Sequence, residues 1–224
     1  MYHKILLDDI ELGKFINFLP DLEKDEVYYL SLFGRHKYCS SLLNLRDNQL
    51  ARFTSSKQDL REKILQLECP IGGYRRDGED VPQEALALYI ALNPRSLVRA
   101  NKELLVELAR CCVEDKFNFN PLSLARTAVH RAVGRKVFVD FDYDHVEPEE
   151  YLPYIKGILP DDSYGILKTR GGFHLFVYLD RVDKKNNWFT SLRDLKGCDV
   201  KGSNTLCPVA GCTQGGFVPK LELY

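Results

Sequence analysis

The chain has 224 residues, of which 45% are hydrophobic and 28% charged, and its formal net charge is −1. This composition excludes disordered, collagen-like and coiled-coil proteins, and the length allows one large domain or two small lobes. No run of about 18 or more apolar residues is present, and charged residues interrupt the apolar N-terminus. We therefore expect no membrane span, no signal peptide and a cytoplasmic location. The seven scattered cysteines are expected to be reduced thiols.

The first half of the chain indicates a mixed α/β lobe over residues 1–115. Apolar periodicity and capping residues predict, in chain order, a helix over residues 9–19, a strand over 27–33, a helix capped by Ser55 or Ser56 that continues through Leu67, and a buried strand over 84–92. Asn93-Pro94 and Asn120-Pro121 are typical helix starts. We therefore expect one helix from Asn93 to about Glu114 and another from Asn120 that ends at Gly134.

The second half shows a definite order of periodicities. The expected elements are a strand over residues 137–143, a helix over 148–159, strands over 164–168 and 173–179, a helix over 186–196, and a last strand region that begins at 198–200 and continues through 206–209 and 217–223. The order βαββαβ is the split βαβ arrangement of RNA-recognition modules, with spatial strand order 4-1-3-2. Residues 116–224 are therefore expected to form an RRM-like lobe with helices on one sheet face and the other face open, in a fold of class α+β.

Alternating side chains place three carboxylates on that open face. Along residues 137–144, the apolar side chains belong to the face under the helices, so Asp140, Asp142 and Asp144 project from the other. Residues i and i+2 of a strand stand about 6 to 7 Å apart, which allows two carboxylates to bind one hard cation. Because adjacent ionised carboxylates repel each other, a divalent metal ion between them is the simplest candidate.

The topology brings further polar residues to the same place. The third strand is antiparallel to the first, so His174 at its start lies beside Asp142 at the end of the first. Asp199 begins the fourth strand, on the far side of the first. The sequence therefore predicts that Asp140, Asp142, His174 and Asp199 meet at one end of one sheet face.

A basic, glycine-containing turn precedes His174. It consists of Lys168, Thr169, Arg170, Gly171 and Gly172. Paired glycines let backbone N–H groups converge on an anion, and Lys, Arg and Thr add donors for phosphate oxygens. A triphosphate held there beside a carboxylate-bound metal is an arrangement for phosphoryl or nucleotidyl transfer by two metal ions.

Three motifs resemble those of the archaeo-eukaryotic primase superfamily. They are Val-Phe-Val-Asp-Phe-Asp at residues 137–142, Thr-Arg-Gly-Gly-Phe-His at 169–174 and Cys-Asp-Val-Lys at 198–201. They look most like the primase-polymerase branch of mobile-element, phage-like and CRISPR-associated systems. The resemblance covers residues 130–224 well and the first 115 only loosely, as the N-terminal lobe that closes the family's active-site cleft.

The resemblance implies specific roles for the site residues. Asp140, Asp142 and Asp199 would be catalytic metal ligands, and Thr169 with His174 would hold the phosphates of the incoming nucleotide. We add Lys168, Arg170 and Gly172 to the expected nucleotide-binding set, although the family pattern often has a small residue at the position of Arg170.

The implied activity is template-directed synthesis or extension of primers on single-stranded DNA from NTPs or dNTPs, with Mg²⁺ or Mn²⁺ as cofactors. Template contacts are expected from Arg35, Lys37, Arg75 and Arg76 and from the basic segment over residues 126–136. Further domains of a longer parent protein are possible partners.

Two other functions fit the same residues. An RNA-recognition module shares the topology, and residues 170–177 have some likeness to its basic-glycine-aromatic motif, but three carboxylates would then face the RNA. A metal-dependent nuclease is the second alternative, because three carboxylates and a histidine serve hydrolysis as well as synthesis. The phosphate-binding turn favours a nucleotide substrate without excluding the nuclease.

Overall fold

The computed structural model describes residues 1–39, 48–76, 78–116, 118–183 and 186–224, and it has a mixed α+β fold with two antiparallel sheets. The N-terminal sheet has the strand order β11-β5-β1-β2, with β6 also paired to β1. Its strands are β1 (Glu26–Gly34), β2 (Asn48–Ser55), β5 (Leu86–Ala91), β6 (Arg95–Ser96) and β11 (Leu206–Pro208). The short strands β3 (Arg75–Arg76) and β4 (Glu79–Asp80) form a separate hairpin.

The C-terminal sheet has the strand order β10-β7-β9-β8-β12. Its strands are β7 (Phe138–Asp144), β8 (Tyr164–Thr169), β9 (Gly172–Tyr178), β10 (Cys198–Lys201) and β12 (Lys220–Leu223). The first four of these in space, β10-β7-β9-β8, stand in the predicted order 4-1-3-2. All pairs are antiparallel, as the prediction for the carboxylate cluster requires.

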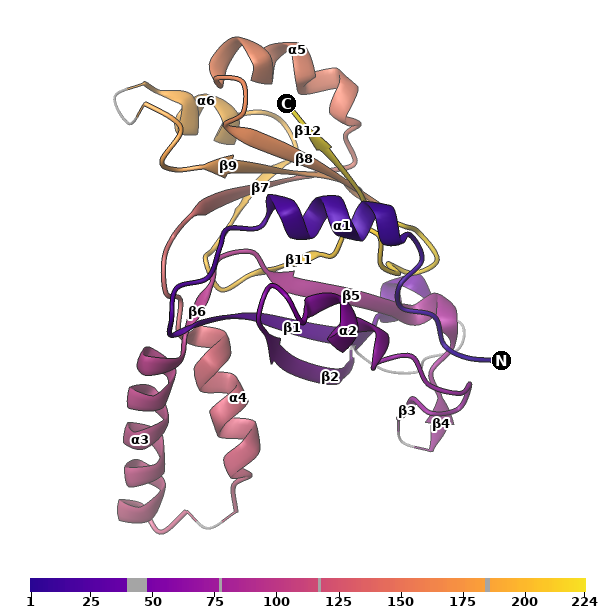
Figure 1. The fold of residues 1–224 in the computed structure, drawn as a ribbon, viewed down its shortest axis with the longest axis vertical. Helices are drawn as coiled ribbons and strands as arrows, with labels where there is room; N and C mark the ends of the chain where they lie inside the picture. Colours follow the sequence, from indigo (N-terminus) through magenta and orange to yellow (C-terminus); the bar gives the residue numbers. More distant parts are fainter. Residues whose placement is uncertain (40–47, 77, 117, 184–185) are drawn as a thin grey trace.

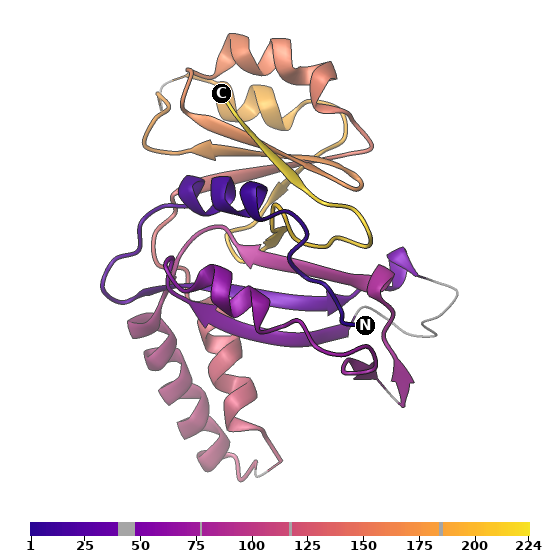
Figure 2. The same cartoon turned by 45° about the vertical axis from the view of Figure 1, so that its right-hand side comes forward.

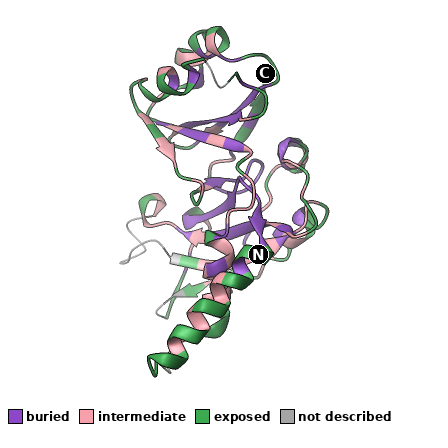
Figure 3. Cartoon of the chain, turned by 90° about the vertical axis from the view of Figure 1, so that its left-hand side faces the viewer, coloured by how far each residue is buried: buried purple, intermediate pink, exposed green. Residues whose placement is uncertain are grey.

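Six α-helices surround the two sheets in the described part of the chain. They are α1 (Asp9–Phe18), α2 (Leu60–Leu65), α3 (Leu97–Val113), α4 (Pro121–Arg131), α5 (Pro148–Ile158) and α6 (Trp188–Arg193), with two 3₁₀ turns, η1 (His36–Tyr38) and η2 (Gln83–Ala85). Figure 1 shows α5 and α6 above the C-terminal sheet, α1 between the sheets, and an α3–α4 hairpin that projects from the opposite end. Figure 3 shows that this hairpin is largely exposed. Among the described residues, no helix combines the length and apolar character that crossing a bilayer requires.

The prediction of a continuous last strand region was wrong. Residues 206–208 form β11, which pairs with β5 at the edge of the N-terminal sheet, and β12 pairs with β8 at the edge opposite β10. The chain leaves β10 through Gly202 to Thr205, crosses to the other sheet, and returns to the first. The two halves of the sequence are therefore interleaved at β11.

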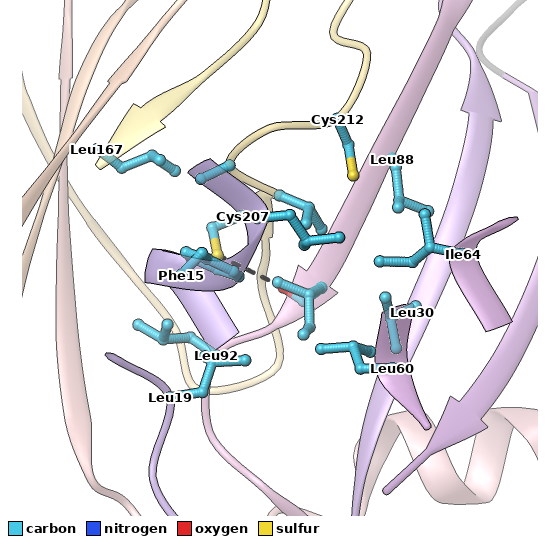
Figure 4. Packing of buried hydrophobic residues seen from close by; sticks show 14 of the residues in the cluster. Phe15, Leu19, Leu30, Leu60, Ile64, Leu88, Leu92, Leu167, Cys207 and Cys212 are labelled. Carbon is cyan, nitrogen blue, oxygen red and sulfur yellow. Dashed lines mark hydrogen bonds between the residues drawn. The ribbon is translucent and has the colours of Figure 1, made fainter. Parts of the chain in front are cut away.

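The second face of the C-terminal sheet is covered over part of its area, not open as predicted. The Phe18 ring of α1 lies 5.0 Å from Phe138, 6.1 Å from Phe176 and 5.2 Å from Tyr178, measured between ring centroids. These residues belong to one buried cluster with side chains of the N-terminal sheet and α2. Figure 2 also shows α1 between the sheets, and Figure 4 shows Phe15 and Leu19 beside Leu167, Leu92 and Cys207. The opposite face packs under α5 and α6 around Phe141, as the alternation predicts.

Two helix starts differ in an informative way. Asn120 caps α4, since its side chain accepts a hydrogen bond from the Ser123 N–H at 3.1 Å, as predicted. Asn93 does not cap a helix: α3 begins at Leu97, and Ser96 is its cap. Helix α2 is also shorter than expected, because Ser55 ends β2 and the helix starts at Leu60.

All seven cysteines are free thiols, and the buried Cys207 thiol donates to the Ile90 carbonyl at 3.6 Å (Figure 4).

Candidate functional site

Three strands align the predicted polar residues in one row across the C-terminal sheet. Asp199 of β10 lies directly opposite Asp142 of β7, and Asp142 lies directly opposite His174 of β9. In the next row, Lys201 stands opposite Asp140. Directly opposed residues of antiparallel strands have Cβ atoms about 4.5 to 5.5 Å apart. The backbone register therefore brings together the four residues that the sequence predicts to meet.

The His174 ring lies between two carboxylates. Its Nδ1 is 2.8 Å from Asp140 Oδ1, and its Nε2 is 3.6 Å from Asp142 Oδ1. Only 8% of the His174 side chain is exposed. Burial lowers the pKa of His174, but the charge of Asp140, its hydrogen bond and the charge of Asp142 raise the pKa by more, to a net value above the ordinary one. The ring thus fixes the spacing of the two β7 carboxylates.

Lys201 is the second cationic group of the cluster. Its Nζ lies 3.0 Å from Asp142 Oδ2 and 2.5 Å from Asp199 Oδ2. The side chains of Asp140 and Asp142 are 11% and 15% exposed, whereas that of Asp199 is 66% exposed. Asp199 therefore stands at the solvent side of the cluster, and the ammonium group of Lys201 joins it to the buried part.

A pocket of about 270 Å³ extends from this cluster to the N-terminal sheet. The C-terminal sheet and the turn after β8 contribute Asp142, Asp144, Thr169, Gly171, His174 and Lys201 to its lining, and the rest of the chain contributes Arg35, Lys37, Tyr89, Thr205, Leu206, Pro208 and Gln214. The lining combines carboxylates at one end with cations and hydroxyl groups. Such a wall suits a ligand that carries both anionic groups and a metal ion.

Two other pockets differ in their relation to the cluster. One of about 210 Å³ lies on the other side of Lys201 and Asp140, and its lining includes Asn93, Lys136 and Phe189. A larger one, of about 580 Å³, lies between β2, α2 and α4 and has cations but none of the predicted catalytic residues. We regard the 270 Å³ pocket as the candidate site, because Asp142, His174 and Lys201 line it. Asp140 lines the 210 Å³ pocket instead, and Asp199 lines neither of these two pockets.

The glycine turn contributes backbone geometry as well as side chains. Gly172 has a φ of +150°, and a Cβ atom there would lie 2.0 Å from the Tyr143 carbonyl oxygen, so β9 can start beside β7 only with glycine at this position. Thr169 donates its hydroxyl hydrogen to the Gly172 carbonyl at 3.1 Å. Thr169 and Gly171 line the pocket, as expected for the turn.

Several predicted site residues lie elsewhere. Lys168 is on the opposite side of its strand from Leu167 and pairs with Glu147 at the start of α5, at 2.5 Å. Arg170 donates to the Gly215 carbonyl at 2.6 Å and stacks on Tyr38, which ties the turn to another loop. Lys168 and Arg170 therefore have partners within the chain, and neither lines the 270 Å³ pocket.

The four residues predicted to contact template lie in different parts of the structure. Arg35 and Lys37 line the pocket, next to the carboxylate cluster. Arg75 pairs with Asp80 within the β3–β4 hairpin, at 2.7 Å, and lines none of the three pockets above. The side chain of Arg76 lies outside the part of the structure that is described.

Sequence reasoning gave no role in the site to five lining residues: Tyr89, Lys201, Thr205, Leu206 and Pro208. Lys201 has a sequence signal, because strand alternation places it on the same face as Asp199, but a lysine is not part of the predicted set of metal ligands. Tyr89 comes from the buried strand β5, a segment with no motif. Gln214 lies in a second polar, glycine-rich turn over residues 211–216, whose composition also suits a nucleotide contact, and its side chain accepts the Arg170 N–H at 2.9 Å. Thr205 lies in the crossing between the sheets.

The donor chemistry of the cluster suits a hard divalent cation. In the described ranges, no group of three or more His, Cys, Asp or Glu side chains is already arranged to hold a metal ion. Lys201, however, places a positive charge between Asp142 and Asp199, so the two carboxylates already converge on a cation. Oxygen ligands of this kind are those that Mg²⁺ and Mn²⁺ prefer.

Comparisons of this chain with protein-family models, with curated proteins and with solved structures find no match.

Proposed function

We propose that this protein is a nucleotidyltransferase that synthesises or extends primers on single-stranded DNA from NTPs or dNTPs. The observation that carries the proposal is the row of Asp199, Asp142 and His174 across three strands, with Asp140 beside it. Asp142 and His174 of this row line a pocket of about 270 Å³. Metal-dependent transfer of a phosphate-bearing group uses carboxylates to hold the metal ions and cationic groups to bind the phosphates, and both are present at this pocket.

Each part of the site has a role in this proposal. Asp140, Asp142 and Asp199 would hold two divalent ions, Mg²⁺ or Mn²⁺, and His174 keeps the β7 carboxylates oriented. When bound, such ions neutralise the charge of a triphosphate and lower the pKa of an attacking hydroxyl group. Thr169 and the backbone at Gly171 contact the triphosphate, together with Lys37 from the other side of the pocket.

The architecture supports the same proposal. The strand order β10-β7-β9-β8, with α5 and α6 packed on one face, supports the proposal of an RRM-like lobe, and in this proposal the 270 Å³ pocket would be the active-site cleft. Together with the three sequence motifs, this organisation is similar to that of the primase-polymerase branch. Arg35, which the sequence predicts at the template, lines the 270 Å³ pocket together with Asp142, so in this proposal it would contact the nucleotide.

One observation disfavours the alternative of an RNA-recognition module. Such modules stack bases on aromatic side chains of the sheet face that their helices leave free. Here Phe138, Phe176 and Tyr178 on that face are buried against α1, with 3%, 0% and 8% of their surface exposed. These rings are therefore inaccessible to bases, whereas the carboxylate end of the face reaches a pocket.

The test is incubation with single-stranded DNA, labelled nucleotides and Mg²⁺ or Mn²⁺, with and without an annealed primer. We expect labelled products longer than the primer, or new short products without one. Shortening of the DNA without incorporation would identify a metal-dependent nuclease instead. DNA binding without any change in DNA length would indicate a binding module and contradict the proposal.

A further inference from the structure

Lys201 occupies an unusual place for a lysine in a metal-dependent site. Its Nζ lies 3.0 Å from Asp142 and 2.5 Å from Asp199, and only 21% of its side chain is exposed. The ammonium group donates a hydrogen bond to Asp199 Oδ2 and forms an ion pair with Asp142 Oδ2. The ammonium group therefore lies inside the carboxylate cluster, between two of the proposed metal ligands.

The strand register explains how Lys201 reaches this place. Asp199 and Lys201 are two residues apart on β10, so both project from the same face of the sheet. Lys201 stands opposite Asp140, but Asp140 is already hydrogen-bonded to His174. The flexible four-carbon stem of lysine lets the ammonium group turn back by one row to Asp142 and Asp199.

The charges of the cluster show what this ammonium group does. Asp142 of β7 and Asp199 of β10 are directly opposite each other on neighbouring strands. Two ionised carboxylates at such a separation repel each other unless a cation lies between them. His174 is hydrogen-bonded to Asp140 and lies farther, at 3.6 Å, from Asp142. Lys201 is thus the cation in direct contact with both Asp142 and Asp199, in the position that a divalent ion would take.

We propose that Lys201 is a resident counter-cation, which holds Asp142 and Asp199 together in the metal-free protein and is displaced from them when a divalent ion binds. This inference rests on the proposed metal-dependent function. It implies that the metal must compete with an internal ammonium group, so that Lys201 weakens metal affinity and preserves the site in the absence of metal. Lys201 then remains at the wall shared by the 270 Å³ and 210 Å³ pockets.

The test is Mn²⁺ binding by purified protein without nucleotide or DNA, followed by the electron paramagnetic resonance signal of free Mn²⁺. Lys201→Met removes the charge but keeps a side chain of similar length, and we expect it to bind Mn²⁺ about tenfold more tightly than the wild type. Without metal, the same variant should melt at a lower temperature than the wild type, and added Mn²⁺ should reduce that difference.

Two further variants serve as controls. Lys57→Met removes a lysine of nearly equal exposure, 22%, which pairs with Asp21 at 2.9 Å outside the site, and it should leave Mn²⁺ affinity unchanged. Lys201→Arg keeps the positive charge and should bind Mn²⁺ no more tightly than the wild type. If Lys201→Met fails to fold, Lys201→Gln replaces it in the same comparison.

The outcomes separate this inference from the proposed function. Mn²⁺ binding that is equal or weaker in Lys201→Met than in a metal-binding wild type would overturn the role of Lys201 and leave the metal site standing. Absence of Mn²⁺ binding in both proteins would overturn the metal-dependent function and this inference with it. Binding by Lys201→Met alone would mean that Mn²⁺ does not displace Lys201 in the wild type, and it would contradict both this inference and the proposed function.

Discussion

The Asn93 side chain joins the two sheets through three hydrogen bonds. Its Oδ1 accepts the N–H groups of Val137 and Phe138 at 2.7 and 2.9 Å, and its Nδ2 donates to the Phe138 carbonyl at 3.1 Å. Asn93-Pro94 looked like a helix start because asparagine is a common cap, but the same hydrogen-bonding groups serve β7 instead. A local sequence pattern cannot distinguish these partners, because β7 lies more than forty residues away along the chain.

We expect Asn93→Ala to lower the free energy of unfolding by about 3 kcal/mol, since it leaves buried backbone groups at the start of β7 without partners. Urea denaturation measures the loss. Asn118→Ala, at an exposed position, serves as the control and should change stability by less than about 0.5 kcal/mol. Equal stability of both variants would show that Asn93 does not hold β7.

The Glu26–Arg135 pair makes stability depend on pH. Burial raises the pKa of Glu26, but hydrogen bonds from Arg135 and the Glu23 N–H lower it by more, so the folded-state pKa lies below the ordinary value of 4.5. A carboxylate with a depressed folded-state pKa stabilises the fold above its unfolded pKa and loses this contribution as the pH falls through the folded-state pKa. Stability from this pair is therefore complete at pH 7 and declines below about pH 4.5.

Glu26→Gln should accordingly be less stable than the wild type at pH 7, and the difference should shrink as the pH is lowered toward 3. Unfolding by urea at several pH values between about 3 and 7 gives both curves. A constant difference between wild type and variant across this range would mean that ionisation of Glu26 contributes nothing.

At the scale of elements, strand alternation predicted more than any other signal. It placed Phe141 under the helices and Asp140 and Asp142 on the opposite face, and the register of β7, β9 and β10 followed from the predicted topology. Alternation could not place β11 and β12. Such short strands contain too few residues to show a clear alternation of apolar and polar side chains, and tertiary packing determines which strands they pair with. The sequence predicts no element over the residues of β2, because their apolar and polar side chains alternate only weakly.

The start of β9 supplies a prediction at this scale. Gly172→Ala introduces a Cβ atom into the Tyr143 carbonyl oxygen, so β9 must move away from β7, and we expect a loss of about 3 kcal/mol in stability together with weaker metal binding. Gly157→Ala is the matched control. Its Cβ atom meets nothing within 4 Å inside α5, and alanine there should stabilise the protein by about 0.5 to 1 kcal/mol. Thermal melting and Mn²⁺ titration of both variants measure these effects.

At the scale of the whole molecule, the site depends on contact between the two sheets. Residues of α1, α2 and both sheets share one buried cluster. After β10 in the C-terminal sheet, the chain crosses to the N-terminal sheet, where β11 pairs with β5. This packing covers the apolar part of the face that the sequence left open and brings Arg35 and Lys37 to the carboxylates. The sequence indicated which residues of the C-terminal sheet form the site, but the N-terminal contribution and Lys201 required the packed structure.

The most direct test of the proposed function is nucleotide incorporation by Asp142→Asn, in an assay with primed single-stranded DNA and Mn²⁺. Asp142 contacts both cationic groups of the cluster, so its loss should reduce incorporation by at least about 100-fold while the fold persists. Asp161→Asn, at an exposed position before β8, should retain wild-type incorporation. Equal incorporation by the wild type and Asp142→Asn would contradict the assignment of the carboxylate row as the site of nucleotidyl transfer.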